Sequence, residues 1–130
     1  MSRGIRNNNP GNIRHGPKWL GLSPQQTDPE YSQFTKPEYG IRAMVKLLRN
    51  YQTRHGRKTI EEIITRWAPP SENITGAYVK HVADVAGVDP RAEIDVNNYL
   101  TPMVTAIIKH ENGRQPYTPA QIAEGIRLAG

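Results

Sequence analysis

A glutamate that continues an apolar helical stripe is the residue in this sequence best suited to chemistry. The stripe within residues 98–113 recurs at the three- and four-residue spacing of one helix face and consists of Leu100, Met103, Val104, Ile107 and Ile108. Glu111 falls on the same face, and Gly113 can then end the helix in a left-handed conformation. The pattern predicts a carboxyl group at the C-terminal end of a buried helix.

A carboxylic acid at such a helix end is half surrounded by apolar side chains, which disfavour its charged form. It can therefore hold a proton near neutral pH, as a general acid must before it protonates a glycosidic oxygen. The alternative is that Glu111 turns outward where the helix frays and is solvated, as most glutamates are. The helix pattern alone leaves both interpretations open.

An asparagine-rich stretch, residues 6–21 (RNNNPGNIRHGPKWLG), is the second candidate. Asn8, Asn9 and Asn12 could present amide donors and acceptors to sugar hydroxyls, and Trp19 could offer a flat face to a sugar ring. Asparagine also tolerates tight turns and bonds back to neighbouring backbone. The stretch is therefore equally typical of a purely structural turn cluster.

Tyr78 lies on the apolar face predicted for a helix within residues 71–87. A partly buried tyrosine hydroxyl must find a partner, and a neighbouring carboxyl is a natural one. The alternative is a core tyrosine bonded to a backbone carbonyl. Trp67 could be a substrate platform, but a tryptophan on an apolar helix face is more typical of core packing.

The elements that must position these residues are mainly helical. Proline and glycine break any helical period before residue 37, so residues 1–36 are expected to form a loop or hairpin lobe with a strand at 31–34. Residues 37–130 are expected to form the helical core, with helices at 37–56, 59–67, 71–87, 98–113 and from 119, the second and last opened by capping boxes at Thr59 and Thr118. The sequence thus predicts one mainly α domain, residues 1–130, of about five helices.

Composition narrows the function classes. The chain has 130 residues, no cysteine and four histidines without ligand-type spacing, so neither disulfides, a metal site nor a cofactor is expected. The absence of a long apolar run and of a charged-then-apolar leader predicts no membrane insertion and no signal peptide. Some other route must then carry the protein to any target outside the cytoplasm.

A net charge of +5 predicts attraction to an acidic partner, such as nucleic acid, anionic lipid or the carboxylates of an anionic wall polymer. The basic residues are scattered along the chain and are not interleaved with aromatic residues, which weakens the nucleic-acid interpretation. Charge alone does not choose among the acidic partners, although nucleic acid is the less expected one.

Three short pieces of the sequence occur together and resemble one family. They are the glutamate helix end at 106–113, the asparagine loop at 8–13 with Trp19 and Gly21, and a tyrosine helix with Glu72, Thr75, Tyr78, Val79 and Val82. Together they resemble the lysozyme superfamily, specifically the glucosaminidases and lytic transglycosylases that cut peptidoglycan glycan. In that family the glutamate helix precedes the asparagine loop, so the order here suggests a circular permutation. The stretch RNNNPGNIRHG also resembles small tailed-phage proteins described as lysins or virion components.

The resemblance implies a lysozyme-like domain, expected to be a monomer, with a single-acid mechanism. Glu111 would protonate the oxygen between MurNAc and GlcNAc, Tyr78 would orient it and stabilise the transition state, and Asn9 and Asn12 would position the sugar. Asp28 and Glu38 are candidates for a second carboxylate only because they flank the front lobe. Such a phage lysin would pass from the host cytoplasm to the periplasm and wall, or be carried in the virion.

Two other functions stay open at this point. The first is a non-enzymatic phage virion or wall-binding protein that keeps the fold without the chemistry. The second is a basic nucleic-acid-binding domain, whose affinity would fall steeply with salt.

Overall fold

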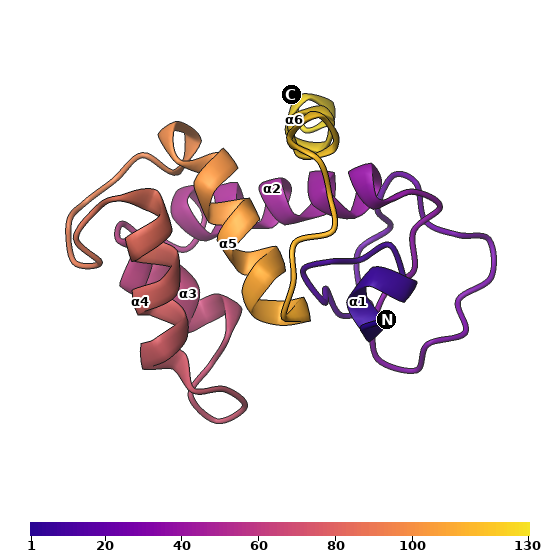
Figure 1. Cartoon of the computed structure of the whole chain (residues 1–130), viewed down its shortest axis with the longest axis horizontal. Coiled ribbons are helices and arrows are strands. Elements are labelled where there is room, and N and C mark those ends of the chain that lie inside the picture. Colours follow the sequence, from indigo (N-terminus) through magenta and orange to yellow (C-terminus); the bar gives the residue numbers. More distant parts are fainter.

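Helices provide the regular structure of the molecule. The computed structural model describes residues 1–130 and has no β-strand, only isolated antiparallel bridges between Arg14 and Tyr31 and between Leu22 and Phe34. The elements in chain order are α1 (Arg3–Arg6), α2 (Pro37–Thr53), α3 (Ile60–Trp67), α4 (Thr75–Ala86), the 3₁₀ turn η1 (Val96–Asn98), α5 (Leu100–Asn112) and α6 (Pro119–Leu128). Figure 1 shows the irregular lobe of residues 1–36, called the front lobe, at one end of the molecule and α3 and α4 at the other. The prediction of a mainly α single domain is confirmed.

Capping side chains start the helices where the sequence predicts. The Thr118 hydroxyl accepts a hydrogen bond from the Gln121 backbone, and the Gln121 side chain accepts one from the Thr118 backbone, which completes a capping box. At α3 the Thr59 hydroxyl caps the backbone of Glu62 in the same way. The Glu62 carboxylate, however, accepts its backbone hydrogen bond from Lys58 and not from Thr59.

Glycines end the two helices that carry the candidate chemistry. Gly87 ends α4 and Gly113 ends α5, with left-handed φ angles of 71° and 74° that would strain a residue with a side chain. The turn at Gly113 leaves Glu111 in the last turn of α5, where the chain leaves the core.

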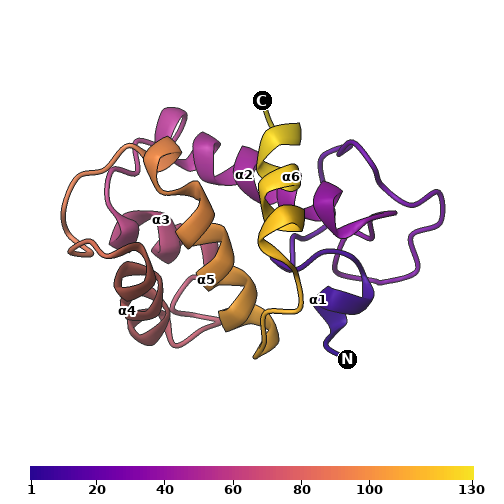
Figure 2. The same cartoon turned by 45° about the horizontal axis from the view of Figure 1, so that its top comes forward.

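The centre of the core lies between α2 and α5. Both helices contribute side chains with no exposed surface: Ile41, Met44, Val45 and Leu48 from α2, and Met103, Val104, Ile107 and Ile108 from α5. α6 crosses α2 (Figure 2), and the crossing is so close that a Cβ atom at Gly125 would collide with Ile41. α4 packs along α5, and this packing brings Tyr78 beside the end of the glutamate helix.

The front lobe departs from the prediction in two ways. Its segments pair only at the isolated bridges, so residues 31–34 do not form the expected strand, and residues 3–6 form the unpredicted helix α1. Two short ion-paired hydrogen bonds of 2.7 Å join the Arg3 guanidinium to Asp28, and these bonds hold the pKa of Asp28 well below its ordinary value. Asp28 also accepts hydrogen bonds from the backbone of Glu30 and Tyr31. The charged carboxylate therefore ties α1 to the loop that the sequence pattern leaves irregular.

Candidate active site

Three residues from distant parts of the chain meet at the end of α5. The Tyr78 hydroxyl donates a hydrogen bond of 2.8 Å to Oε2 of Glu111, and the Asn12 amide donates one of 2.9 Å to Oε1. Tyr78 comes from the first turn of α4 and Asn12 from the front lobe. The carboxyl group is half-buried, so Glu111 neither turns out into solvent nor is sealed in the core.

Burial raises the pKa of Tyr78 far above its ordinary value. The negative charge of Glu111 and the hydrogen bond to it raise this pKa further, and an interaction with Trp67 opposes the shift. The side chain is 1% exposed, so it is held in one orientation by the packing around it. Tyr78 therefore stays protonated and acts as a fixed hydrogen-bond donor to the carboxyl group.

The loop that carries Asn12 is fastened directly to the end of α5. Asn112, which follows Glu111, donates hydrogen bonds of 2.8 Å to the Pro10 carbonyl and 2.9 Å to the Ile108 carbonyl. The Ser2 hydroxyl donates to its side-chain oxygen at 2.6 Å. Asn12 itself has a left-handed backbone with φ of 52°, which asparagine tolerates better than most residues. Asn112 therefore holds the two halves of the site together, a role that its sequence position beside Glu111 alone does not indicate.

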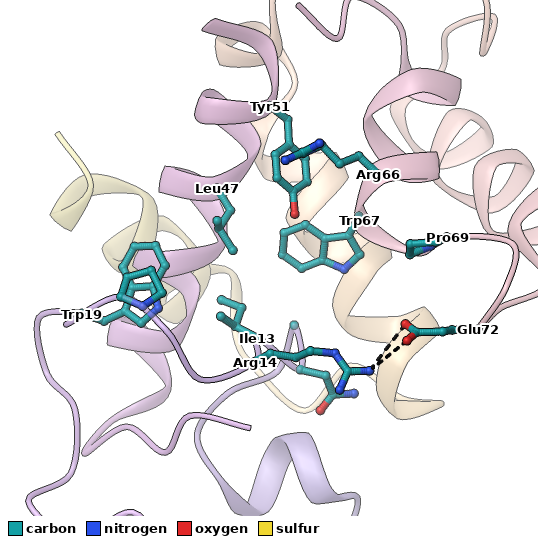
Figure 3. A pocket seen from close by; sticks show the side chains of 12 residues that line it. Ile13, Arg14, Trp19, Leu47, Tyr51, Arg66, Trp67, Pro69 and Glu72 are labelled. Carbon is teal, nitrogen blue, oxygen red and sulfur yellow. Dashed lines mark hydrogen bonds and ion pairs between the residues drawn. The ribbon is translucent and has the colours of Figure 1, made fainter. Parts of the chain in front are cut away.

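The Glu111 side chain lines a small polar cavity, and this cavity adjoins a larger groove. The cavity has a volume of about 140 Å³ and the groove about 330 Å³, and both are lined by Gly11, Asn12, Arg14, Trp67 and Glu72. Figure 3 shows the Trp67 ring in the middle of the groove, Trp19 at one end and Glu72 at the other. An aromatic surface beside amides and charged groups is suited to the CH faces and hydroxyls of sugars.

Trp67 both packs against the core and lines the groove. It meets Tyr51 edge to face, with ring centroids 6.1 Å apart, and Arg66 lies over the Tyr51 ring at 5.2 Å. Trp67 therefore belongs to both the core and the groove. Trp19 is half-buried and lines the groove.

Two of the predicted asparagines lie elsewhere. The Asn9 side chain is fully buried, donates to the Ile13 and Ser32 carbonyls and accepts from the Ile13 backbone N–H. Asn8 donates to the Phe34 carbonyl and lines a separate pocket of the front lobe. The structural turn interpretation therefore fits Asn8 and Asn9, whereas Asn12 alone reaches the acid. A buried amide satisfied by three backbone groups has no capacity left for a ligand.

The carboxylate that shares the cavity with Glu111 is neither of the two candidates drawn from the sequence. Asp28 is bound to Arg3, and Glu38, in the first turn of α2, lines neither the cavity nor the groove. Glu72 does line both, is exposed, and lies 3.5 Å from Arg14 in an ion pair. Neither Asp28 nor Glu38 therefore lines the cavity that Glu111 faces.

A histidine pair lies behind Tyr78. The His110 ring stacks on Tyr78 with centroids 3.9 Å apart, and its Nδ1 lies 3.1 Å from Nδ1 of His81. Burial lowers the pKa of His110, the neighbouring His81 lowers it further, and the negative charge of Glu111 opposes both. His110 therefore resists protonation. As the pH falls through the ordinary histidine value of about 6.5, the unfolded chain binds more protons than the folded one, and His110 then lowers stability.

Replacing His81 by glutamine is expected to raise the pKa of His110, because the charge of protonated His81 is removed. An NMR titration of the His110 ring measures this change. His55→Gln serves as the control, since His55 is paired with Arg66 and is remote from this cluster. An unchanged His110 titration in His81→Gln would show that the two rings are not coupled.

The comparisons with known proteins connect the chain to a phage. No family model matches the sequence. The sequence is 39% identical over 129 residues to Protein P5 of Pseudoalteromonas phage PM2, and the match covers 96% of this chain and 80% of that protein. None of the helices combines the length and apolar character that crossing a bilayer requires.

Proposed function

The chain belongs to the same family as Protein P5 of Pseudoalteromonas phage PM2, and from this premise we propose that it is a phage enzyme that cleaves the glycan strand of bacterial peptidoglycan. The observation that carries the proposal is the position of Glu111, whose two oxygens are held by Tyr78 and Asn12 beside an aromatic groove. A fixed acid at a sugar-sized groove is what protonation of a glycosidic oxygen requires. The resemblance of the three sequence pieces to the lysozyme superfamily supports the same reaction.

In this mechanism Glu111 first acts as an acid. It gives its proton to the oxygen between MurNAc and GlcNAc, and the C–O bond breaks as positive charge develops on the sugar. The carboxylate that forms keeps the hydrogen bonds from Tyr78 and Asn12, which stabilise its negative charge. Glu111 then acts as a base. It takes a proton either from a water whose oxygen bonds to the sugar carbon that lost the leaving oxygen, or from a hydroxyl of the same sugar whose oxygen bonds to that carbon and closes an anhydro ring.

The place where the protein would act follows from its proposed substrate, the peptidoglycan of the host wall. A phage protein of this kind would act as a monomer on the wall of its host, either after release from the cytoplasm at lysis or as part of the virion. The positive net charge of +5 favours association with the carboxylates of the wall.

A non-enzymatic phage protein that binds the wall is the second candidate. Both oxygens of Glu111 already have partners within the protein, and the other carboxylate of the cavity is paired with Arg14. These contacts are also what a purely structural glutamate would make. In this case the groove would hold glycan without cutting it.

Mass spectrometry of purified peptidoglycan after incubation with the protein tests the proposal. Soluble muropeptides are expected, and their ends identify the reaction, because anhydro, reducing MurNAc and reducing GlcNAc ends differ in mass or in sensitivity to borohydride. Protein that sediments with intact sacculi and releases no muropeptide would refute cleavage and favour the second candidate.

A further inference from the structure

A basic hollow continues the groove beyond Trp19. It is lined by Pro17, Lys18, Trp19, Leu20, Arg42 and Lys46, and no acidic residue lines it. Pro17 and Trp19 line the groove as well, so the two spaces share a wall. Trp19 lies at the end of the groove opposite Glu72, which lines the cavity of Glu111 (Figure 3). The hollow is therefore reached by a ligand that extends along the groove away from the acid.

The three cations of the hollow have no acidic partner in the protein. Arg42 donates from Nε to the Leu128 carbonyl, and neither Lys18 nor Lys46 makes a side-chain hydrogen bond or an ion pair. Arg42 and Lys46 lie one turn apart on the same face of α2, where like charges repel. Both are half-buried, so their stems are held against the surface. An anion in the hollow would relieve the repulsion between them.

The spacing along α2 sets the size of the ligand. Tyr51 and Leu47 line the groove, whereas Lys46 and Arg42 line the hollow. The nine residue steps from Arg42 to Tyr51 correspond to about 13 Å of helix. A ligand that occupies both spaces is therefore longer than one sugar ring and carries its negative charge away from the bond at Glu111.

We propose that Lys18, Arg42 and Lys46 form a subsite for carboxylates of the peptides that are attached to a peptidoglycan glycan strand. The inference rests on the proposed function, because the strand must lie in the groove for its peptide to reach the hollow. A nucleic acid fits less well, since Glu72 lines the groove and places negative charge along the path of a phosphate backbone. The subsite selects substituted strands over neutral glycan.

Binding of soluble glycan strands tests the subsite directly. Strands with natural peptide carboxylates and strands with amidated carboxylates are titrated into Glu111→Gln protein, so that they stay uncut. Natural strands are expected to bind about tenfold more tightly than amidated strands. This difference corresponds to the summed binding free energy of three partly exposed ion pairs. The triple variant Lys18→Gln, Arg42→Gln and Lys46→Gln is expected to lose this difference.

A triple variant with the same loss of charge, Lys36→Gln, Arg54→Gln and Lys58→Gln, is the matched control, because all three positions are exposed and line none of these spaces. It is expected to keep the preference for natural strands. Equal affinity for both kinds of strand, or a preference that survives the first triple variant, would overturn the subsite. Duplex DNA that binds as tightly as natural strands, and only while the hollow is intact, would also overturn it.

The same materials separate the two proposals. Protein that prefers natural strands but releases no muropeptide with Glu111 present keeps the subsite and refutes cleavage. Protein that releases muropeptides equally from natural and amidated strands keeps cleavage and refutes the subsite.

Discussion

Glu111→Gln is expected to lower the release of muropeptides from peptidoglycan by about a hundredfold or more, while the protein stays folded. The amide cannot donate the proton that the glycosidic oxygen needs, and a positioned general acid contributes about a hundredfold to ten-thousandfold. Turnover is measured as soluble muropeptide per unit time at equal protein concentration. An unchanged rate would remove Glu111 from the mechanism.

The fold is expected to tolerate this change because the amide can replace both hydrogen bonds. The glutamine carbonyl can accept from the Tyr78 hydroxyl at the position of Oε2. Its amide N–H then faces Asn12, whose buried side-chain oxygen has no partner in the native structure and can accept after the Asn12 amide rotates. We expect a loss of at most about 1 kcal/mol in the free energy of unfolding, measured by urea denaturation.

Glu72→Gln is the matched control, since Glu72 is the other carboxylate of the same cavity. A single-acid mechanism predicts a reduction of less than about tenfold, because only the exposed ion pair with Arg14 is lost. A loss as large as that of Glu111→Gln would instead indicate a mechanism with two carboxylates.

The helices could be predicted because their signals are local. Apolar spacing and the caps at Thr59, Thr118, Gly87 and Gly113 fix where α3 to α6 begin or end, and the structure confirms these ends to within a few residues. The helix α1 has only four residues, too few to show a period. It forms where the Ser2 side chain caps it and Arg3 is bound to Asp28, a contact between residues 25 apart.

The site could be predicted only in part, because only some of its signals are local. Glu111 and Tyr78 each lie on the apolar face of their own helix, so their meeting follows once α4 and α5 pack together. Which asparagine reaches the acid depends on the path of the front lobe, which is set by contacts between distant residues. The Asn12 amide is directed at Glu111, whereas the Asn9 amide is directed into the lobe. Residue type could not separate the two.

Asn9→Ala is accordingly expected to destabilise the protein by about 3 kcal/mol, equivalent to about 10 °C in Tm for a domain of this size. The Asn9 amide provides the sole hydrogen-bond partner of the Ile13 backbone N–H and of the Ser32 carbonyl, both in buried residues. Alanine leaves these two groups desolvated and unpaired, and each such group is costly. Urea denaturation and thermal unfolding measure the loss.

Asn73→Ala is the control for this prediction, because Asn73 is exposed and makes one long hydrogen bond of 3.4 Å to the Pro69 carbonyl. Its free energy of unfolding is expected to change by less than about 0.5 kcal/mol.

The stability and the glycan binding of Asn9→Ala together decide between a structural and a ligand-binding role for Asn9. If Asn9→Ala unfolds at the wild-type urea concentration but no longer binds glycan, then Asn9 contacts the ligand and the lobe opens in solution. If stability falls and glycan binding of the folded fraction persists, Asn9 serves to hold the loop that presents Asn12 to Glu111.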